Sequence, residues 1–290
     1  MNVTVVEAMP EHFEGIYPLL RSLNDKTLSK MEWNRLLTHP WGEGKPFGYA
    51  LRAEDGTYVG FLGTVYSRRE IDGETHDVCN LTSWVVDPAY RQHSLKLAFA
   101  ALKDRQSTIT AFTATKDVSP IWAKLGLQPM EPEYAIAYNW NPLAGIGSRW
   151  GAATEPEDIR GRLSPEEQRI FEDHAAYDCR HLVLFSKRNP ERTCYLVFNA
   201  TRIKGLPVAH LHYAGDRAVF AEAAPYALWR IGLRTGAPLT LVPRRFAPEG
   251  LRGALSVRYR FRPDKIFYRS ARLQAEQLDN LYSELVLLNL

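Results

Sequence analysis

The sequence predicts an α+β protein in which a mixed sheet flanked by helices is followed by a second, related α+β domain. Three observations predict this fold class. Apolar runs separated by polar turns at 54–56 and 72–74 indicate an antiparallel meander. After the meander, an apolar stripe at helical spacing leads into another β-branched run, and a strand, a crossover helix and a return strand form a parallel pair. The order of meander, helix and strand recurs in the second half, which predicts a structural repeat.

The elements of the first half follow from local signals. Ser29 is a typical helix N-cap, and Ser119 followed by Pro120 begins a helix that Gly126 ends. Helices are expected at 11–23, 29–39, 93–105 and 117–126, and strands at 3–8, 47–53, 57–71, 76–86, 108–115 and 134–140.

The second half begins after a stretch rich in Gly, Pro and charged residues. This stretch predicts a linker at 144–163 between a domain at 1–143 and a domain at 164–290. Ser164 and Glu167 have the spacing of a capping box, and Asp216 precedes a long apolar helix. Helices are expected at 164–177, 217–236 and 273–288, and strands at 181–186, 192–203, 206–214, 239–243 and 255–269.

The composition favours a protein without nucleic acid or membrane as partner. The chain has 36 basic and 33 acidic residues, and its formal net charge is +3. No apolar run reaches the roughly 18 residues of a membrane span, and no secretory signal is evident. Three cysteines without framework spacing are typical of a reducing compartment, so we expect a cytoplasmic protein. The segment 244–272 is strongly basic, which indicates a solvated strand face or, as the alternative, a local anionic partner.

Two stretches of the first half carry a family signature. WVVDPAYRQHSLKL at 84–97 runs from a valine-rich strand through Asp-Pro into a helix, and SPIWAKLGL at 119–127 is a later short helix. Together with the order of the elements, they resemble the GNAT superfamily of acyl-CoA-dependent N-acyltransferases. The similarity extends over about half of the chain. The C-terminal half is interpreted as a degenerate second GNAT-like unit.

The resemblance implies an acyl-CoA site around the first stretch. Val85 and Val86 would contact the pantetheine through their main chain, as if it were an added strand. The loop that follows would hold the pyrophosphate at the start of a helix, where unpaired N–H groups attract anions. Cofactor contacts are therefore expected at Arg91, Gln92, His93, Ser94, Leu95 and Lys96, and at Trp122 on the later helix.

The loop departs from the family pattern at two positions. Ser94 and Lys96 stand where the family most often has small residues, chiefly glycine, which let phosphates approach the backbone closely. Two interpretations stay open. Either the Ser94 hydroxyl and the Lys96 charge bind the phosphates, or the Lys96 side chain blocks the site.

The usual catalytic groups of the family are missing. The strand before the loop has no carboxylate at 79–83, and Trp122 stands where a tyrosine is common and has no group that titrates near neutral pH. Asn80 and Thr82 share one face of that strand and are the candidate catalytic residues, with satisfied polar groups of the core as the alternative. Cys79, on the other face, is interpreted as a small buried hydrophobe.

No metal site is expected, because the pairs Cys179/His181 and His210/His212 lack typical zinc spacing. The predicted function is acyl transfer from acetyl-CoA or another acyl-CoA, as co-substrate, to an amine of a small molecule. The alternatives are a catalytically inactive GNAT-like binding protein and an aminoacyltransferase of the Fem type, which also has two such units in one chain. The sequence leaves open whether the protein is a homo-oligomer.

Overall fold

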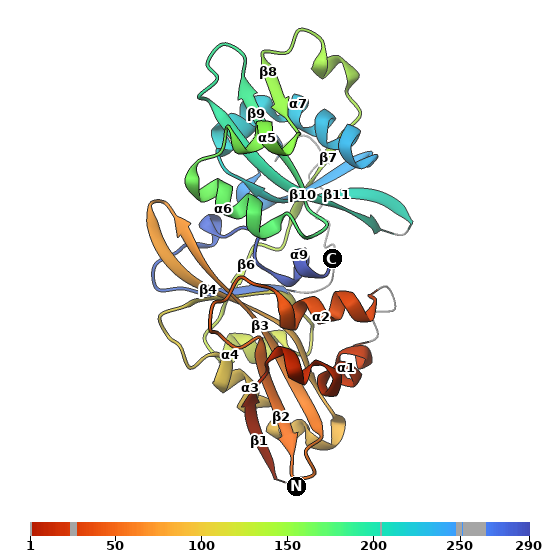
Figure 1. Ribbon diagram of the computed structural model, residues 1–290, viewed down its shortest axis with the longest axis vertical. Helices are drawn as coiled ribbons and strands as arrows, with labels where there is room; N and C mark the ends of the chain where they lie inside the picture. The colour runs from red at the N-terminus through yellow and green to blue at the C-terminus, as the bar shows by residue number, and fades with distance from the viewer. Residues whose placement is uncertain (1, 24–27, 204, 248–250, 252–264) are drawn as a thin grey trace. The chain divides into compact units, whose positions relative to one another are not determined.

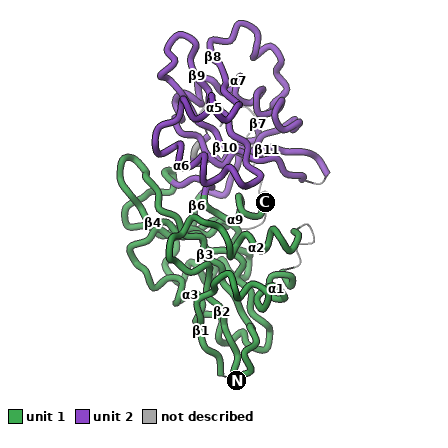
Figure 2. The backbone as a smooth tube through the Cα atoms, in the orientation of Figure 1, with its two compact units in different colours: residues 1–130, 264–277, 282–288 green, residues 131–263, 278–281, 289–290 purple. Residues whose placement is uncertain are grey.

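The computed structural model describes residues 2–23, 28–203, 205–247, 251 and 265–290 (Figure 1). The chain forms two compact units (Figure 2). Unit 1 consists of Met1–Met130, Asp264–Gln277 and Tyr282–Leu288, and unit 2 of Glu131–Pro263, Leu278–Leu281 and Asn289–Leu290. Each unit contains one mixed sheet with helices, which confirms the predicted fold class.

Unit 1 has a seven-stranded sheet in the order β1-β2-β3-β4-β5-β13-β6. The first four strands are antiparallel, and β2, β3 and β4 form the predicted meander; β5 is parallel to β4, and β13 is antiparallel to β5. The strands are β1 (Val3–Glu7), β2 (Gly48–Ala53), β3 (Tyr58–Ile71), β4 (Glu74–Val86), β5 (Thr108–Ala114), β6 (Gln128–Met130) and β13 (Lys265–Arg269).

Two helices of unit 1 begin at the predicted cap or within one residue of it. Ser29 caps its helix, since its Oγ accepts from the Glu32 N–H at 3.2 Å while the Glu32 carboxylate accepts from the Ser29 N–H at 2.6 Å. Ser119 is the first residue of its helix, and Val118 is the cap. The elements are α1 (Phe13–Ser22), α2 (Lys30–Thr38), α3 (Ser94–Ala101), α4 (Ser119–Lys124) and α9 (Glu284–Leu287), with 3-10 turns η1 (Pro10–His12), η2 (Pro88–His93) and η5 (Ala275–Gln277).

Unit 2 repeats the topology of unit 1. The series β8-α5-α6-β9-β10-β11-α7-β12 matches β1-α1-α2-β2-β3-β4-α3-β5, and β12 is parallel to β11 as β5 is to β4. The predicted repeat is therefore confirmed. The elements are β7 (Tyr134–Tyr138), β8 (Trp150–Ala153), β9 (Arg180–Ser186), β10 (Thr193–Ile203), β11 (Leu206–Ala214), β12 (Leu239–Pro243), α5 (Pro156–Arg160), α6 (Pro165–His174), α7 (Arg217–Thr235), η3 (Pro142–Gly145) and η4 (Arg244–Phe246).

Each sheet takes one strand from the other half of the sequence. β7 pairs with β12 in unit 2, and β13 pairs with β5 and β6 in unit 1. The units therefore differ from the predicted domains 1–143 and 164–290. The predicted linker 144–163 contains β8 and α5. This segment belongs to the fold of unit 2, because Trp150 is buried in its core and β8 pairs with β9.

Several predicted helices are shorter than expected, two of them by the largest margin. The helix predicted at 93–105 ends at Ala101, and the Asp104 carboxylate then accepts the N–H groups of Gln106 and Ser107 in a turn. The helix predicted at 273–288 is wrong: a positive φ of 53° at Tyr282 and an extended Ser283 interrupt it, and only η5 and α9 remain. Of the strand predicted at 255–269, the part at 255–264 lies outside the described residues, and β13 is the rest.

Within the described part of the chain, no helix has both the length and the apolar character needed to cross a membrane.

Candidate functional site

The parallel pair of unit 1 separates after three residues. β4 and β5 pair only from Val78 to Asn80, opposite Thr108 to Thr110. β4 continues to Val86, and within the described residues this last part of the strand pairs with β3 alone. One side of the β4 backbone from residue 81 to 86 is therefore an unpaired strand edge beside β5, which we call the β4 edge. Such an edge can accept an extended ligand as an added strand.

A β-bulge redirects β4 at this edge. Ser83 and Trp84 together lie opposite the single residue Leu62 of β3, and Ser83 has a φ of 52°, in the left-handed region. On β3, a Cβ atom at Gly63 would lie 3.2 Å from the Thr82 carbonyl oxygen, so a glycine suits this close approach. Because a bulge increases local twist and bends its strand, it accounts for the divergence of β4 from β5.

The predicted cofactor residues lie at and after the end of the β4 edge. Val85 and Val86 are half-buried in β4. The Asp87 carboxylate accepts the Ala89 N–H at 2.9 Å, and this cap begins η2, which continues directly into α3. The remaining residues lie in η2 and the first turn of α3: Arg91, Gln92, Leu95 and Lys96 are exposed, and His93 and Ser94 are half-buried.

This helix start carries two cations without a counter-ion. Among the described residues, neither the Arg91 side chain nor the Lys96 side chain forms an ion pair or a hydrogen bond. The Ser94 N–H donates to the Arg91 carbonyl. The Ser94 hydroxyl is then the polar group that this residue can offer to an anion, at a position where glycine is common in the family. Exposed positive charge at the start of a helix favours an anion there.

Asn80, a candidate catalytic residue, belongs to a buried polar network at the point where the strands separate. Its Nδ2 donates to Thr110 Oγ1 at 3.1 Å, and its Oδ1 accepts the N–H of Glu284 at 3.4 Å. The Glu284 carboxylate accepts the Thr113 hydroxyl at 2.7 Å. Glu284 and Asn80 are at most 1% exposed. Glu284 thus links β4 to β5, because its main chain contacts Asn80 and its carboxylate contacts Thr113.

Thr82 and Cys79 have the predicted orientations. The Thr82 hydroxyl is buried and lies 3.2 Å from the Ser83 hydroxyl. Cys79 faces the apolar cluster under α3, and burial raises the pKa of its thiol to about 12. A thiol with so high a pKa is a poor nucleophile, in agreement with its interpretation as a small hydrophobe.

Trp122 lies in the core of unit 1. It is 2% exposed, and its ring lies tilted against the ring of Trp84, a residue of the β4 bulge, at a centroid distance of 4.7 Å. The Trp122 indole therefore packs against β4 at the bulge. Direct contact between Trp122 and a cofactor stays a prediction.

The corresponding edge of unit 2 is occupied. β11 and β12 pair over three residues and then separate, but the Asn280 N–H donates to the His212 carbonyl at 3.1 Å, and Arg245 Nε donates to the Leu278 carbonyl at 2.8 Å. At the start of α7, the Asp216 carboxylate accepts the Val219 N–H at 2.9 Å. A carboxylate at this place repels phosphate. In unit 2, the strand edge is therefore covered by the segment at Leu278–Leu281, and the helix start is capped by Asp216.

The histidines and cysteines considered as metal ligands are dispersed. His181 lies on β9, where its Nδ1 is 2.7 Å from the Tyr195 hydroxyl, whereas His210 and His212 lie on β11, on the other side of β10. Burial lowers the pKa of His181 to about 4, and it lowers the pKa of His212 well below its usual value. Within the described residues, no three side chains of a metal-binding kind form a group.

Comparison with solved structures decides the fold. The chain is similar to a GCN5-related glucosamine N-acetyltransferase region of a fungal multi-domain GH3 β-N-acetylglucosaminidase, with a TM-score of 0.60 and 13% identity over 92% of this chain and 38% of that chain. It is also similar to a GCN5-related N-acetyltransferase from Anabaena variabilis, with a TM-score of 0.57 and 10% identity over 92% of this chain and 72% of the other. The protein has the GNAT fold.

A third structure with the GNAT fold, Eis1 from Mycobacterium abscessus, matches with a TM-score of 0.52 and 13% identity over 93% of this chain and 73% of the other. The alignments extend over both units. No family model matches the sequence, and no similar curated protein is found. The protein spans only 38% of the length of the fungal enzyme. At identities of 10–13%, these likenesses establish architecture.

Sequence reasoning missed the residues that complete the network around Asn80. Thr110 and Thr113 read as ordinary strand residues, and Glu284 lies about two hundred positions after β4. The strand bulge at Ser83 also has no sequence signal, because serine seldom adopts the positive φ that it has here.

Proposed function

We propose that unit 1 binds an acyl-CoA along the β4 edge and transfers its acyl group to the amine of a small molecule. The observation that carries the proposal is the open β4 edge, which leads directly into a helix start with two unpaired cations. A pantetheine chain has amide groups that can pair with a strand backbone, and the pyrophosphate attached to it is the anion that such a helix start favours.

The reaction joins the amine to the acyl carbon. The amine nitrogen attacks the thioester carbonyl, the C–N bond forms, and the C–S bond breaks with release of the CoA thiol. The amine must lose a proton, and the departing sulfur must gain one. Glu284 is the carboxylate that the fold brings to the inner end of the β4 edge, so we assign to it the uptake of the amine proton, with Asn80 holding its main chain in place.

A binding protein without turnover is the second candidate. Two observations favour it: Glu284 is fully buried, and Trp122 replaces a titratable group with a core indole. In that case, CoA binds to the same edge, but no acyl group is transferred. An aminoacyltransferase of the Fem type has less support, because a substrate RNA calls for a more basic surface than a net charge of +3 provides.

Isothermal titration calorimetry with CoA and acetyl-CoA tests binding. We expect a dissociation constant in the micromolar range, and the absence of heat at millimolar ligand would refute the proposal. Lys96→Ala is expected to weaken binding about three- to fivefold, since an exposed charge contributes about 1 kcal/mol or less. Lys124→Ala, at an exposed lysine of the short helix α4, is the matched control. Tighter binding by Lys96→Ala would show that the lysine obstructs the site.

Release of free CoA thiol separates turnover from binding. The full chain is incubated with acetyl-CoA and a panel of amines that begins with glucosamine and free amino acids. Glucosamine comes first because one similar structure is described as a glucosamine N-acetyltransferase region. Thiol release that depends on one class of amine supports the enzyme, whereas binding without release for every amine supports the second candidate.

A further inference from the structure

A separate cavity of unit 1 lies at the opposite end of the sheet from the β4 edge. Its volume is about 680 Å³. β4 and β5 are parallel, so the β4 edge and η2 are at their carboxyl ends, whereas the cavity surrounds the residues that precede the amino end of β5. The cavity is lined by the end of α3, the loop into β5, the residue after α4 and the end of β13, namely Phe99, Leu102, Lys103, Arg105, Ser107, Leu125, Arg269, Ser270 and Ala271.

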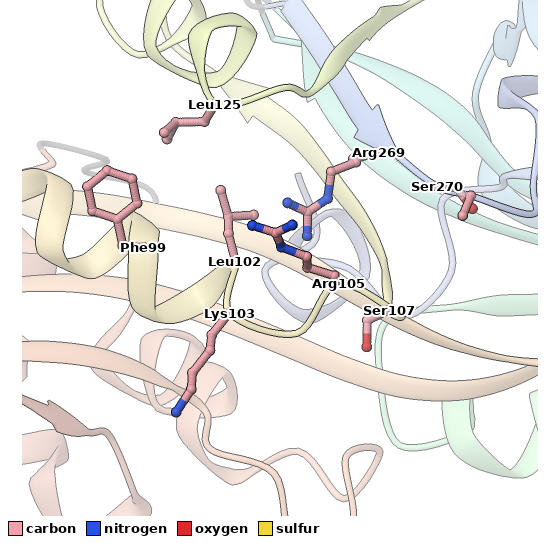
Figure 3. A pocket seen from close by; sticks show the side chains of 9 residues that line it. Phe99, Leu102, Lys103, Arg105, Ser107, Leu125, Arg269 and Ser270 are labelled. Carbon is pink, nitrogen blue, oxygen red and sulfur yellow. The ribbon is translucent and has the colours of Figure 1, made fainter.

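Two guanidinium groups meet in this cavity. Figure 3 shows Arg105 and Arg269 pointing toward one another from two different elements, beside Leu102, while the Lys103 ammonium points away from them. Among the described residues, neither arginine forms an ion pair; Arg269 Nη2 donates only to the Asp104 carbonyl, at 3.1 Å. Burial, and after it the charge of Arg105, lower the pKa of Arg269, and Asp104 counteracts this less strongly. The pair is therefore repulsive as it stands.

The adjacent carboxylate does not neutralise these cations. The Asp104 side chain accepts the Gln106 N–H at 2.9 Å, and the Ser107 hydroxyl at 2.7 Å. It thus holds the turn before β5 and faces its own loop. An anion between the two guanidinium groups would relieve their repulsion, and a phosphate offers enough oxygens to accept hydrogen bonds from both.

One side of the cavity lining is apolar. Phe99 is 60% exposed at the surface of α3, although it is a large aromatic residue, and Leu102 and Leu125 lie in the same lining. Figure 3 shows the Phe99 ring and Leu125 on the side of Leu102 away from Ser270. A cavity with two cations at one end and an aromatic ring at the other is complementary to a ligand with both characters.

We propose that this cavity is a second ligand site of unit 1, which binds a small organic phosphate whose remainder is aromatic or aliphatic. Arg105 and Arg269 bind the phosphate, and Phe99, Leu102 and Leu125 cover the apolar part. Arg269, one of the basic residues of the segment 244–272, then binds a local anionic partner.

Calorimetry with phenyl phosphate, inorganic phosphate and phenol tests the site in the full chain. We expect phenyl phosphate to bind with a submillimolar dissociation constant, inorganic phosphate to bind about tenfold more weakly, and phenol to give no heat. Added salt should weaken binding of phenyl phosphate. If phenol binds as well as phenyl phosphate, or if neither phosphate gives heat, the proposal is wrong.

Two variants and one control make the test specific. Arg105 is exposed and lies outside the strands, so its replacement should not disturb the fold. Arg105→Gln should weaken the binding of phenyl phosphate about tenfold. Phe99→Ala should reduce the affinity for phenyl phosphate to that for inorganic phosphate. Arg272→Gln removes an exposed arginine three residues beyond Arg269 and outside the lining, and it should change nothing. Equal losses in Arg105→Gln and Arg272→Gln would overturn the assignment.

Competition separates the cavity from the β4 edge and from a lipid source of phosphate. Saturating acetyl-CoA should leave the affinity for phenyl phosphate unchanged, whereas displacement would mean that the two ligands share one site. Vesicles of phosphatidic acid in phosphatidylcholine should not sediment the protein. Sedimentation that Arg105→Gln abolishes, without binding of phenyl phosphate, would overturn the proposal of a small soluble ligand.

Discussion

Replacement of His39 by phenylalanine should remove a defined part of the acid sensitivity of unit 1. His39 is 4% exposed, and its ring lies 5.3 Å from the Trp41 ring and 4.9 Å from the Phe47 ring. Burial among these rings lowers the pKa of His39 from 6.5 to about 4. The unfolded chain therefore takes up a proton at this residue at a higher pH than the folded chain does, and stability is lost as the pH falls below 6.5.

The magnitude follows from the two pKa values of His39. Near neutral pH, His39 is neutral in both states and its contribution to the free energy of unfolding is fully present. At about pH 5, His39 is protonated in the unfolded state and still mostly neutral in the folded state, and the free energy of unfolding is about 2 kcal/mol lower for this reason. We expect the loss of unfolding free energy between these two pH values to be about 2 kcal/mol smaller in His39→Phe than in the parent protein. Urea unfolding followed by tryptophan fluorescence measures this difference.

A control variant distinguishes titration from packing. Leu97→Ala removes a buried apolar side chain of α3 and no titratable group, so it should lower the unfolding free energy by about the same amount at both pH values. The reasoning is refuted if His39→Phe loses as much stability between the two pH values as the parent protein does.

Two further predictions concern the site and its counterpart in unit 2. Glu284→Gln keeps the volume and an oxygen that can accept the Thr113 hydroxyl, so we expect CoA binding to persist while the turnover rate falls about a hundredfold; an unchanged rate and pH profile would exclude Glu284 as the proton acceptor. Asp216→Ala removes the cap on the Val219 N–H, and it should lower the unfolding free energy by about 1 kcal/mol without any effect on CoA binding. Circular dichroism melts and calorimetry measure both effects, and a loss of CoA affinity in Asp216→Ala would contradict the assignment of the site to unit 1.

The parts of the fold that the sequence predicts are those with local causes. The meander, the crossover into α3 and the repeat in the second half depend on periodicity and turn residues within short segments. The cap at Ser29 has a partner three residues away, and the cap at Ser164 has the same spacing. The residues from Val85 to Lys96 are contiguous in the chain, so their common position at one end of the sheet was also predictable.

The exchange of strands was not predictable, because it depends on distant partners. β7 reads as the last strand of the first half, and only its pairing with β12 places it in unit 2. The C-terminal segment has helical periodicity, but its residues from Leu278 to Leu288 are buried on every side and cannot follow one amphipathic helix. Glu284 consequently reaches Asn80 from a position that no local pattern indicates.

The central claim is that an acyl-CoA binds to the β4 edge of unit 1 and not to its counterpart in unit 2. Amide hydrogen–deuterium exchange of the full chain, with and without saturating acetyl-CoA, tests it most directly. The account predicts slower exchange in peptides that contain residues 81–96, and unchanged exchange in peptides that contain residues 208–219, where Asp216 and the segment at Leu278–Leu281 already occupy the equivalent places. Unchanged exchange at 81–96, or protection at 208–219 instead, would contradict it.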